Sequence, residues 1–317
     1  MNPGKIISLI IFSSAIFFLL NSCSKDDSEA ARIEALTLKI TGDINTDSLE
    51  AQVKWLQSMG TRFTLANNRK NVALNIRNRF RMMGYDDARI DSFGIVKTYK
   101  GISYNQMQYN VIASLGAGTT SDSVCIIGGH FDNILGSGDP FTFAPGANDN
   151  ASGVAAAIEI ARVMKKNNYV PASEILFIAF SAEELGLYGS KDYASDAKQT
   201  FQKIRLMLNN DMIAYEPSPD KTYWMVNIMD YSNSQYLRKE AEGLCLKYTL
   251  LKPYNDNTSN ADSDSYSFFL YGYKAIFFIS RLMDPTYHTI RDVATNCNFE
   301  YCREIVKLNC AILINKN

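Results

Sequence analysis

The sequence predicts an α/β protein with a mixed, mostly parallel central sheet and helices on both faces. Three observations predict this fold class. Short apolar runs alternate with amphipathic stretches along the 317 residues, which is the pattern of strands joined by helices. Several runs are apolar throughout, as in strands buried on both faces. Polar and charged residues follow directly after them, where open parallel sheets bind their ligands.

The first half of the chain is predicted to form two helices and then three strands. Leu49, Val53 and Leu56 recur at helical spacing after a polar segment that can cap a helix. The second amphipathic segment ends before Gly84. The expected elements are a helix that begins near Thr46, a helix over 68–83, and strands over 88–98, 107–115 and 123–128.

The second half begins with a predicted loop over 131–149, which is rich in Gly, Pro, Asp and Asn. Val154, Ile158 and Ala161 then mark the apolar face of a strong helix, which Asn150 or Ser152 can cap. The expected elements are helices over 150–166, 183–194, 235–246 and 299–314 and strands over 174–180, 204–208, 224–229 and 275–279.

The first 22 residues are predicted to be a lipoprotein signal peptide. Lys5 is followed by an apolar stretch over 6–20, which is shorter than a membrane span of about 20 residues and typical of a signal-peptide core. The Leu-Asn-Ser-Cys that follows resembles a lipobox, in which Cys23 would be lipidated and become the mature N-terminus. An uncleaved membrane anchor is the alternative.

The predicted organisation is therefore a signal peptide over 1–22, a polar tether over 23–35 and one folded domain over 36–317. We expect an exported protein anchored to the cell envelope through the lipid on Cys23, on the periplasmic or surface side of an outer membrane.

Composition excludes some classes of protein and leaves disulfide pairing open. The formal net charge is −1 and the basic residues are dispersed, so no nucleic-acid footprint is present. Five cysteines follow Cys23, which leaves at least one unpaired. Cys297 and Cys302 are close enough in sequence to pair. No CxxC pair occurs, so a thiolate zinc site is not expected.

Two histidines and four carboxylates stand at strand ends or helix starts. Taken alone, each has an ordinary interpretation, because a lone histidine is usually structural and an acid can cap a helix or favour its first turn. The six residues are His130, His288, Asp149, Glu183, Glu184 and Asp211.

Taken together, these side chains predict a site for two zinc-like ions. Two imidazoles and three carboxylates suffice when one carboxylate bridges the ions. Two ions about 3.5–4 Å apart can acidify a shared water and polarise a carbonyl group. A further carboxylate is then needed as general base, and the adjacent Glu183 and Glu184 can supply both a ligand and a base. Cobalt or manganese can occupy such sites as well.

Five motifs resemble the two-zinc aminopeptidase superfamily: Gly-Gly-His-Phe-Asp, Gly-Ala-Asn-Asp-Asn-Ala-Ser-Gly-Val, Phe-Ser-Ala-Glu-Glu-Leu-Gly-Leu-Tyr-Gly-Ser, Asn-Asn-Asp-Met and Tyr-His-Thr. That superfamily includes bacterial leucyl aminopeptidases, glutamate carboxypeptidase II and, more distantly, glutaminyl cyclases. The motifs occur in the family's order, and the resemblance covers roughly residues 45–315. It implies the zinc exopeptidase fold, which is phosphorylase/hydrolase-like.

The resemblance also implies a role for each matching residue. Glu183 would be the general base, and Asp132 the catalytic-site partner that orients the imidazole of His130. The implied metal ligands are Asp149 as the bridge, His130 and Asp211 at one ion, and Glu184 and His288 at the other.

One segment departs from the family's pattern. Asp264 matches a Ser-Asp-His motif near the site, but Ser265 stands where a histidine is usual. Some relatives carry a tyrosine shortly before this motif to stabilise the oxyanion, and residues 258–261 contain none. Tyr266 and Tyr287 are nearby candidates, but the favoured interpretation of each is a packing residue.

The function predicted from this resemblance is an aminopeptidase with two zinc ions per chain and peptide substrates. A glutaminyl cyclase is the first alternative, but cyclases carry one zinc, an aspartate just before the glutamate pair and a nearby tryptophan. Here Ser181 and Ala182 precede the pair, and neither Trp55 nor Trp224 is near it in sequence. A non-catalytic binding module would lack ligands that this chain retains. Carboxypeptidase or dipeptidase specificity stays open.

Overall fold

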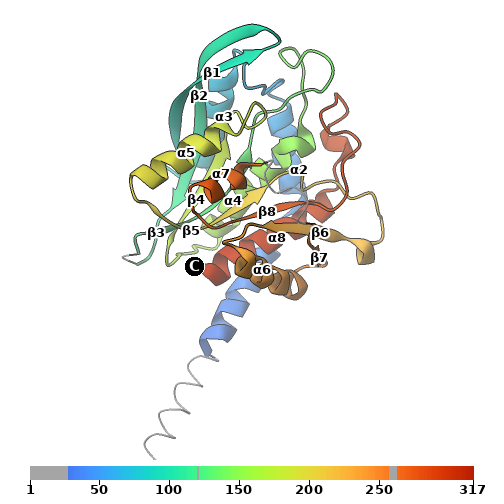
Figure 1. Ribbon diagram of the computed structural model, residues 1–317. Helices are drawn as coiled ribbons and strands as arrows, with labels where there is room; N and C mark the ends of the chain where they lie inside the picture. Colours follow the sequence, from blue (N-terminus) through green and yellow to red (C-terminus); the bar gives the residue numbers. More distant parts are fainter. Residues whose placement is uncertain (1–27, 120, 257–262) are drawn as a thin grey trace, which may run out of the picture.

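The computed structural model describes residues 28–119, 121–256 and 263–317, which form one α/β domain around an eight-stranded sheet (Figure 1). The strand order is β1-β2-β4-β3-β5-β8-β6-β7. Strands β4, β3, β5 and β8 run parallel at the centre, and β2 and β6 flank them in antiparallel orientation. The predicted fold class is confirmed. The strands are β1 (Arg89–Tyr99), β2 (Ile102–Leu115), β3 (Ser123–His130), β4 (Glu174–Phe180), β5 (Lys203–Asn210), β6 (Met225–Asp230), β7 (Lys252–Tyr254) and β8 (Ala275–Ser280).

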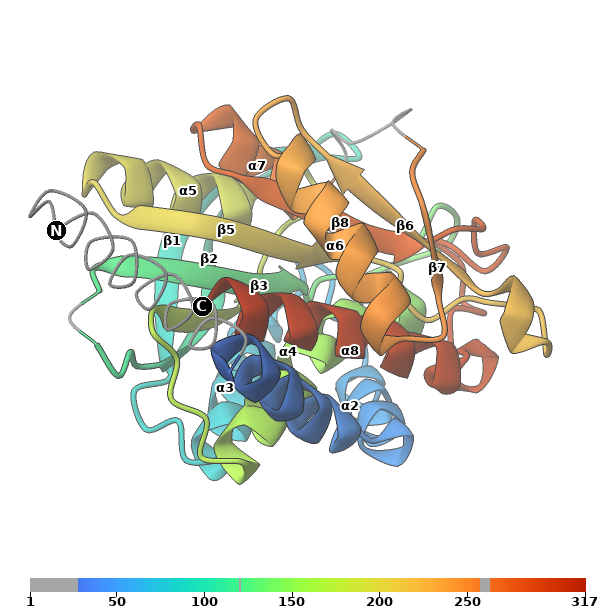
Figure 2. The ribbon, with the colours of Figure 1, turned by 90° about the horizontal axis from the view of Figure 1, so that it is seen from below.

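Helices cover both faces of the sheet. In Figure 2, α5 and α7 lie on one side of the strands, and α2, α3, α4 and α8 lie on the other. Helix α6 packs against α8 and β6. The larger core cluster lies under the second group, because α4 and α8 are buried along most of their length. The helices are α2 (Thr46–Gln57), α3 (Arg69–Met82), α4 (Ser152–Lys166), α5 (Tyr188–Gln199), α6 (Gln235–Tyr248), α7 (Asp264–Leu270) and α8 (Phe299–Lys316).

Helix α4 illustrates how sequence places the ligand loops. Its first residues are small, and the helix is buried from Ser152 to Ala161, so it packs closely under the central strands. Ala151 is the N-cap residue, and the side-chain oxygen of Asn150 before it accepts a hydrogen bond of 2.9 Å from the Gly153 amide. The turn Ala147–Ala151 precedes the helix. The predicted loop over 131–149 therefore ends directly above the start of a buried, fixed helix.

The predicted helix over 183–194 is wrong at its start, because α5 begins only at Tyr188. Ala182 and Leu187 adopt left-handed backbone conformations, each with φ of 60°. The amides of Glu183 and Glu184 donate hydrogen bonds to the Asp132 carboxylate. Both glutamates therefore lie in a loop held by tertiary contacts, and not in the first turn of a helix.

The first described residues are helical. Residues 28–42 form a helix, and Ile33 and Leu36 pack against the main core. This helix overlaps with the predicted tether over 23–35. Cys23 and the predicted signal peptide lie outside the described residues. Within the described ranges, no helix combines the length and apolar character needed to cross a membrane.

The five described cysteines are all free thiols. Cys297 and Cys302 are therefore not joined to each other, and the Cys297 sulfur instead lies 3.9 Å from the carbonyl oxygen of Val293. Cys125, Cys245, Cys302 and Cys310 are buried.

Candidate metal centre

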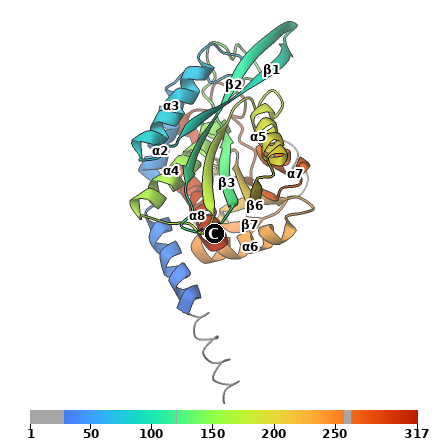
Figure 3. The same cartoon turned by 90° about the vertical axis from the view of Figure 1, so that its left-hand side faces the viewer.

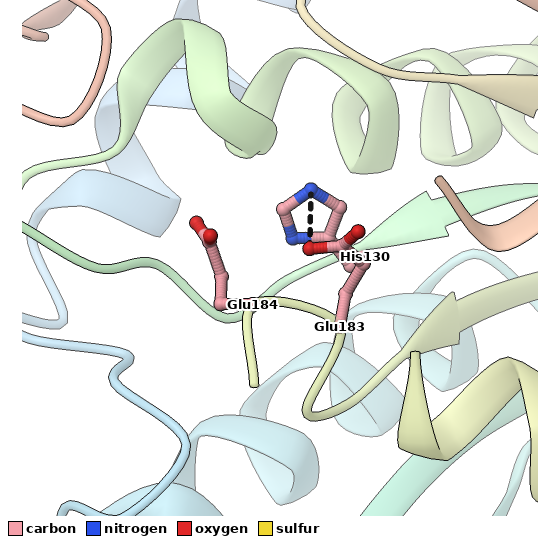
Figure 4. A group of neighbouring side chains, drawn as sticks. All are labelled: His130, Glu183 and Glu184. Atoms are coloured by element: carbon pink, nitrogen blue, oxygen red, sulfur yellow. Dashed lines mark ion pairs between the residues drawn. The ribbon is translucent and has the colours of Figure 1, made fainter. Parts of the chain in front are cut away.

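The predicted site residues meet at the carboxyl edge of the central strands. His130 is the last residue of β3, the Glu183–Glu184 pair follows β4, and Asp211 follows β5. Because β4, β3 and β5 are adjacent and parallel, their ends lie side by side. Figure 4 shows the carboxylate of Glu183 against the His130 ring, with Glu184 beside them.

Asp149 stands between two groups of ligands. His130 Nε2 lies 3.3 Å from Asp149 Oδ1 and 3.4 Å from Asp211 Oδ1. On the other side, His288 Nε2 lies 3.1 Å from Asp149 Oδ2 and 3.1 Å from Glu184 Oε2. Each group has ligand atoms that all lie within 4.8 Å of one another. The two oxygen atoms of one carboxylate thus face two different histidines.

These donor atoms fit a pair of cations. Buried oxygen atoms normally accept hydrogen bonds, yet Asp211 Oδ1 and Glu184 Oε1 accept none within the described part of the chain. One imidazole and two carboxylate oxygens on each side form a donor set that suits zinc. The structure therefore brings together the five predicted ligands in the two groups that the sequence interpretation assigned.

The electrostatics of the site reflect crowded carboxylates. Burial lowers the pKa of His288, but Asp149 and Glu184 outweigh it and raise this pKa to about 10. Burial, with Asp149 next to it, raises the pKa of Glu184 to about 8. Burial also tends to raise the pKa of Asp149, but His130 and His288 bring it below its usual value. Divalent cations at this place would offset the repulsion among the acids.

Glu183 lies next to the ligands but belongs to neither group centred on Asp149. Its Oε2 atom is 3.9 Å from His130 Nε2, and the residue is only 9% exposed. Burial raises the pKa of Glu183 well above its usual value, against the opposing effect of His130. A carboxylate with such a pKa, at the wall of a groove, suits the predicted role of general base.

Asp132 connects β3 to the glutamate loop. His130 Nδ1 lies 3.1 Å from the Asp132 carbonyl oxygen and 3.6 Å from Asp132 Oδ1. The Asp132 carboxylate accepts hydrogen bonds from the amides of Glu183 and Glu184, at 3.0 and 3.3 Å, and from Thr64 Oγ1 at 2.7 Å. The position of Asp132 agrees with the prediction that it orients the imidazole of His130. Its carboxylate also fixes the backbone of both glutamates.

A groove leads from the metal centre across the end of the sheet. Because alternate strand residues face the same side, Phe277 and Ile279 of β8 share a face with their β6 partners Met229 and Asn227. These residues line the groove, together with Met212 next to Asp211. Asp256, Arg281, Leu282, Met283 and Tyr287 also line it.

The two tyrosine candidates for the oxyanion donor are placed differently. The Tyr287 ring stacks on the His288 ring with centroids 3.7 Å apart, and Tyr287 lines the groove. The Tyr266 ring packs against Tyr231 and Phe269 instead. Ser265, at the departure from the family pattern, is buried with its hydroxyl 2.9 Å from that of Tyr231. Residues 258–261 lie outside the described residues.

Asp264 is fully buried behind the site. Burial raises its pKa to about 7, and the nearby imidazole of His130 opposes this increase. The preceding residue, Ser263, donates a hydrogen bond of 2.7 Å to Asp211 Oδ2. This bond leaves Asp211 Oδ1 as the oxygen atom that faces His130.

Two aspartates that the sequence interpretation missed hold the loop before α4. Asp292 accepts hydrogen bonds from the amides of Asn148 and Asp149, at 2.7 and 3.0 Å. Asp284 accepts one of 2.8 Å from Asn148 Nδ2. Both lie within four residues of His288 in the sequence. This closeness to a predicted ligand is the signal that could have identified them. They couple the loop of His288 to the loop of Asp149.

Comparisons with known proteins agree with this site. The profile of Peptidase family M28 matches residues 110–313. A "Probable zinc metalloprotease" of Pyrenophora teres f. teres is 30% identical over 199 residues, which are 58% of this chain and 42% of the relative. "Leucine aminopeptidase 1" of Ajellomyces capsulatus is 28% identical over 220 residues, 65% of this chain and 55% of the relative. The chain thus spans about half the length of these relatives.

The fold is also shared with a solved structure. The crystal structure of LapB from Legionella pneumophila superposes with a TM-score of 0.76 at 22% identity, covering 89% of this chain and 75% of LapB. At that identity the likeness shows the fold alone.

Proposed function

Because the chain belongs to peptidase family M28, we propose that it is a zinc aminopeptidase that hydrolyses the N-terminal bond of peptides with two zinc ions. The observation that carries this proposal is the position of Asp149, whose two oxygen atoms face separate histidine and carboxylate pairs. His130 and Asp211 would hold one ion, and His288 and Glu184 the other. When bound, the ions supply a Lewis acid and lower the pKa of a water molecule.

Glu183 moves the proton in this proposal. Its raised pKa allows the carboxylate to take a proton from the attacking water and to return it to the leaving amine. Asp132 keeps the Glu183 carboxylate within reach of the reacting atoms, because the Asp132 carboxylate accepts a hydrogen bond from the Glu183 backbone amide. Tyr287 lines the groove, and its hydroxyl group can donate a hydrogen bond to the oxyanion of the substrate. Burial and the neighbouring acids raise the pKa of Tyr287, so its phenol stays protonated.

The acidic character of the centre suits the free amino group of a peptide. Carboxylates in a buried site stabilise an ammonium group that an acetylated substrate would lack. The adjoining floor is apolar, since Met212, Met229 and Phe277 line it. We propose that the N-terminal residue places an apolar side chain on this floor, where burial contributes about 25 cal/mol per Å².

The two tryptophans argue against the glutaminyl cyclase alternative. Trp224 is 2% exposed and packs edge-on against Tyr301. Trp55 is covered by the Arg79 guanidinium, 4.9 Å from its ring. Neither tryptophan lines the groove, so neither can cover a glutaminyl substrate there.

The test uses the full chain purified with zinc. We expect hydrolysis of leucine p-nitroanilide, no hydrolysis of its N-acetylated form, and two zinc ions per chain by metal analysis. Glutaminyl peptides are assayed for cyclisation in the same preparation. Cyclisation with one zinc ion per chain would establish the cyclase instead. A protein that holds two zinc ions but cleaves no unblocked peptide would be a binding module.

We further propose export and lipid anchoring at Cys23. The helix over 28–42 contacts the end of α8, where Asn315 Nδ2 lies 3.2 Å from Thr37 Oγ1. Asn317 then bonds to Ser173, directly before β4 begins. The metal centre lies at the other end of β4, and Figure 3 shows the β1–β2 ribbon and the helix over 28–42 at opposite ends of the molecule. An anchor before residue 28 would leave the groove facing away from the membrane.

Metabolic labelling with a fatty acid tests the anchor. The wild-type chain should take up the label and fractionate with membranes, and Cys23→Ser should do neither. Equal membrane association of an unlabelled Cys23→Ser protein would favour the uncleaved anchor.

A further inference from the structure

Arg62 is a buried cation in the segment between α2 and α3. It is 1% exposed, and within the described part of the chain its guanidinium donates hydrogen bonds to backbone carbonyl oxygens alone. Nε donates to Phe131 at 2.7 Å, Nη1 to Pro145 at 2.9 Å and to Leu56 at 3.3 Å, and Nη2 to Gly146 at 2.6 Å. Among the described residues, no carboxylate forms an ion pair with it.

Three of these carbonyl groups, those of Phe131, Pro145 and Gly146, belong to the segments next to His130 and Asp149. Phe131 directly follows His130, and Gly146 stands three residues before Asp149. The planar guanidinium therefore joins the end of β3 to the start of the turn before α4. A rigid fork of donors fixes distances in a way that a flexible ammonium group does not.

Asn133 completes this connection. Its Oδ1 accepts a hydrogen bond of 3.0 Å from the Arg62 amide, and its Nδ2 donates one of 2.7 Å to the Ala144 carbonyl. Packing around the fork is close, because a Cβ atom on Gly146 would lie 2.8 Å from Arg62 Nη2. The side chain and the backbone amide of Arg62 thus hold the two loops in a fixed position relative to each other.

The charge of Arg62 has a separate effect on the site. Burial lowers the pKa of Arg62 to about 10, while Asp292, Asp132, Asp149 and Glu184 stabilise its charged form. The guanidinium is therefore protonated at neutral pH. A fixed positive charge opposes the binding of further cations, whereas a fixed ligand spacing favours it. The two effects predict opposite results when Arg62 is replaced.

We propose that Arg62 is a positioning residue whose hydrogen-bonding fork sets the spacing between His130 and Asp149 and thereby raises the metal affinity of the site. The residue lies outside the segment 110–313 that the family profile matches. The inference rests on the metal centre proposed above. Groups that orient metal ligands typically change affinity by about 10–100-fold when they are removed.

The test compares Arg62→Met, which removes the charge and the fork, with Arg62→Lys, which keeps the charge and loses the fork. Arg79→Met is the matched control, because Arg79 bonds to Gln52 and covers Trp55 on the helical side, with no contact to the ligand loops. Zinc affinity is measured by competition with a chromogenic chelator on the full chain. The cobalt-substituted proteins are compared by visible absorption, and thermal unfolding is recorded with and without zinc.

We expect both Arg62 variants to bind zinc about 10–100-fold more weakly than wild type, with a changed cobalt spectrum and a smaller increase in Tm on adding zinc. Arg79→Met should lower Tm alike in both forms and leave affinity and spectrum unchanged. Tighter zinc binding by Arg62→Met would show that charge dominates and would overturn the proposal.

Unchanged affinity with lower stability would leave Arg62 a purely structural residue and also overturn the inference. If Arg62→Met does not fold, Arg62→Lys decides, because it retains the buried charge and tests the fork alone. A wild-type protein that binds no zinc contradicts the proposed metal centre itself, and this outcome is distinct from equal binding by wild type and variants.

Discussion

Two clusters of acidic side chains in this protein differ in what surrounds them. The metal centre combines its carboxylates with two imidazoles at 3.1–3.4 Å. The second cluster joins Asp91 of β1 to Asp192 and Asp196 of α5, and burial together with the charge of Asp196 raises the pKa of Asp91 and of Asp192. Within the described residues, the second cluster is not among the groups whose donor atoms converge on a metal position.

The two clusters differ in how their carboxylates are held. Acidic side chains form a metal centre when neighbouring groups fix the orientation of each carboxylate. At the centre, Asp292 holds the backbone of Asp149 and Asp132 holds that of Glu183 and Glu184. No such pair of amide contacts is found for Asp192 in the described part of the chain. Changes at the first cluster should therefore alter chemistry, and changes at the second should alter stability alone.

The largest effect is expected for Glu183→Gln. The variant keeps the shape of the side chain and the hydrogen bond from the backbone amide of residue 183 to Asp132, but it removes the carboxylate that accepts a proton. Turnover of leucine p-nitroanilide should fall by about 10²–10⁴-fold, with zinc content unchanged by metal analysis. The isosteric control is Asp192→Asn in the second cluster, which should keep normal turnover. A near-normal rate for Glu183→Gln would remove Glu183 from the mechanism.

Asp149→Asn should weaken the binding of both ions at once. The amide offers one oxygen, so it cannot present a carboxylate oxygen to each of the two groups that Asp149 faces. We expect zinc affinity to fall by about 10–100-fold or more at both sites, measured by chelator competition. Two tightly held zinc ions in this variant would contradict the bridging role, and loss of a single ion would assign Asp149 to one site.

Tyr287→Phe tests whether the uncharged hydroxyl group of Tyr287, beside the metal centre, takes part in catalysis. The ring should still stack on His288, and only the hydroxyl group is lost. We expect kcat to fall by about 10–100-fold with KM little changed, because an oxyanion contact stabilises the transition state more than the substrate. Tyr266→Phe is the control, since that ring packs against Phe269 away from the groove. Equal rates for the two variants would leave the oxyanion donor elsewhere.

The fold and the gathering of the candidate ligands at one edge of the sheet were predictable because they leave periodic or positional signals. The runs at 123–128, 174–180 and 204–208 are mostly apolar, and the structure places β3, β4 and β5 there. His130 and Asp211 follow the first and the last of these runs within three residues. Since parallel strands end at one edge, their sequence positions already imply that they lie close together.

The supporting residues could not be predicted in the same way. Arg62 lies in a short connection without periodicity, and its role depends on carbonyl groups more than 60 residues away in sequence. Local propensity predicts a helix at Glu183, but the hydrogen bond from the Glu183 amide to Asp132 overrides it, because this contact joins segments that follow different strands. The short strand β7 and helix α7 were missed because their few residues carry too little pattern.

The smallest effect belongs to the second cluster, where Asp192→Asn should stabilise the protein. Burial and the charges of Asp196 and Asp91 raise the pKa of Asp192 from 3.8 to about 6. The folded state therefore holds this proton more tightly than the unfolded state, so the free energy of unfolding falls as pH rises through that window.

Asparagine at position 192 removes the repulsion, and we expect the free energy of unfolding to increase by about 0.5–1 kcal/mol above pH 6. This gain is smaller than the full pKa shift implies, because the side chain is half-exposed and screened. The gain should disappear near pH 4 and shrink with added salt. Urea unfolding of both proteins at several pH values measures this, and a gain that persists at low pH would show that Asp192 acts through packing and not through charge.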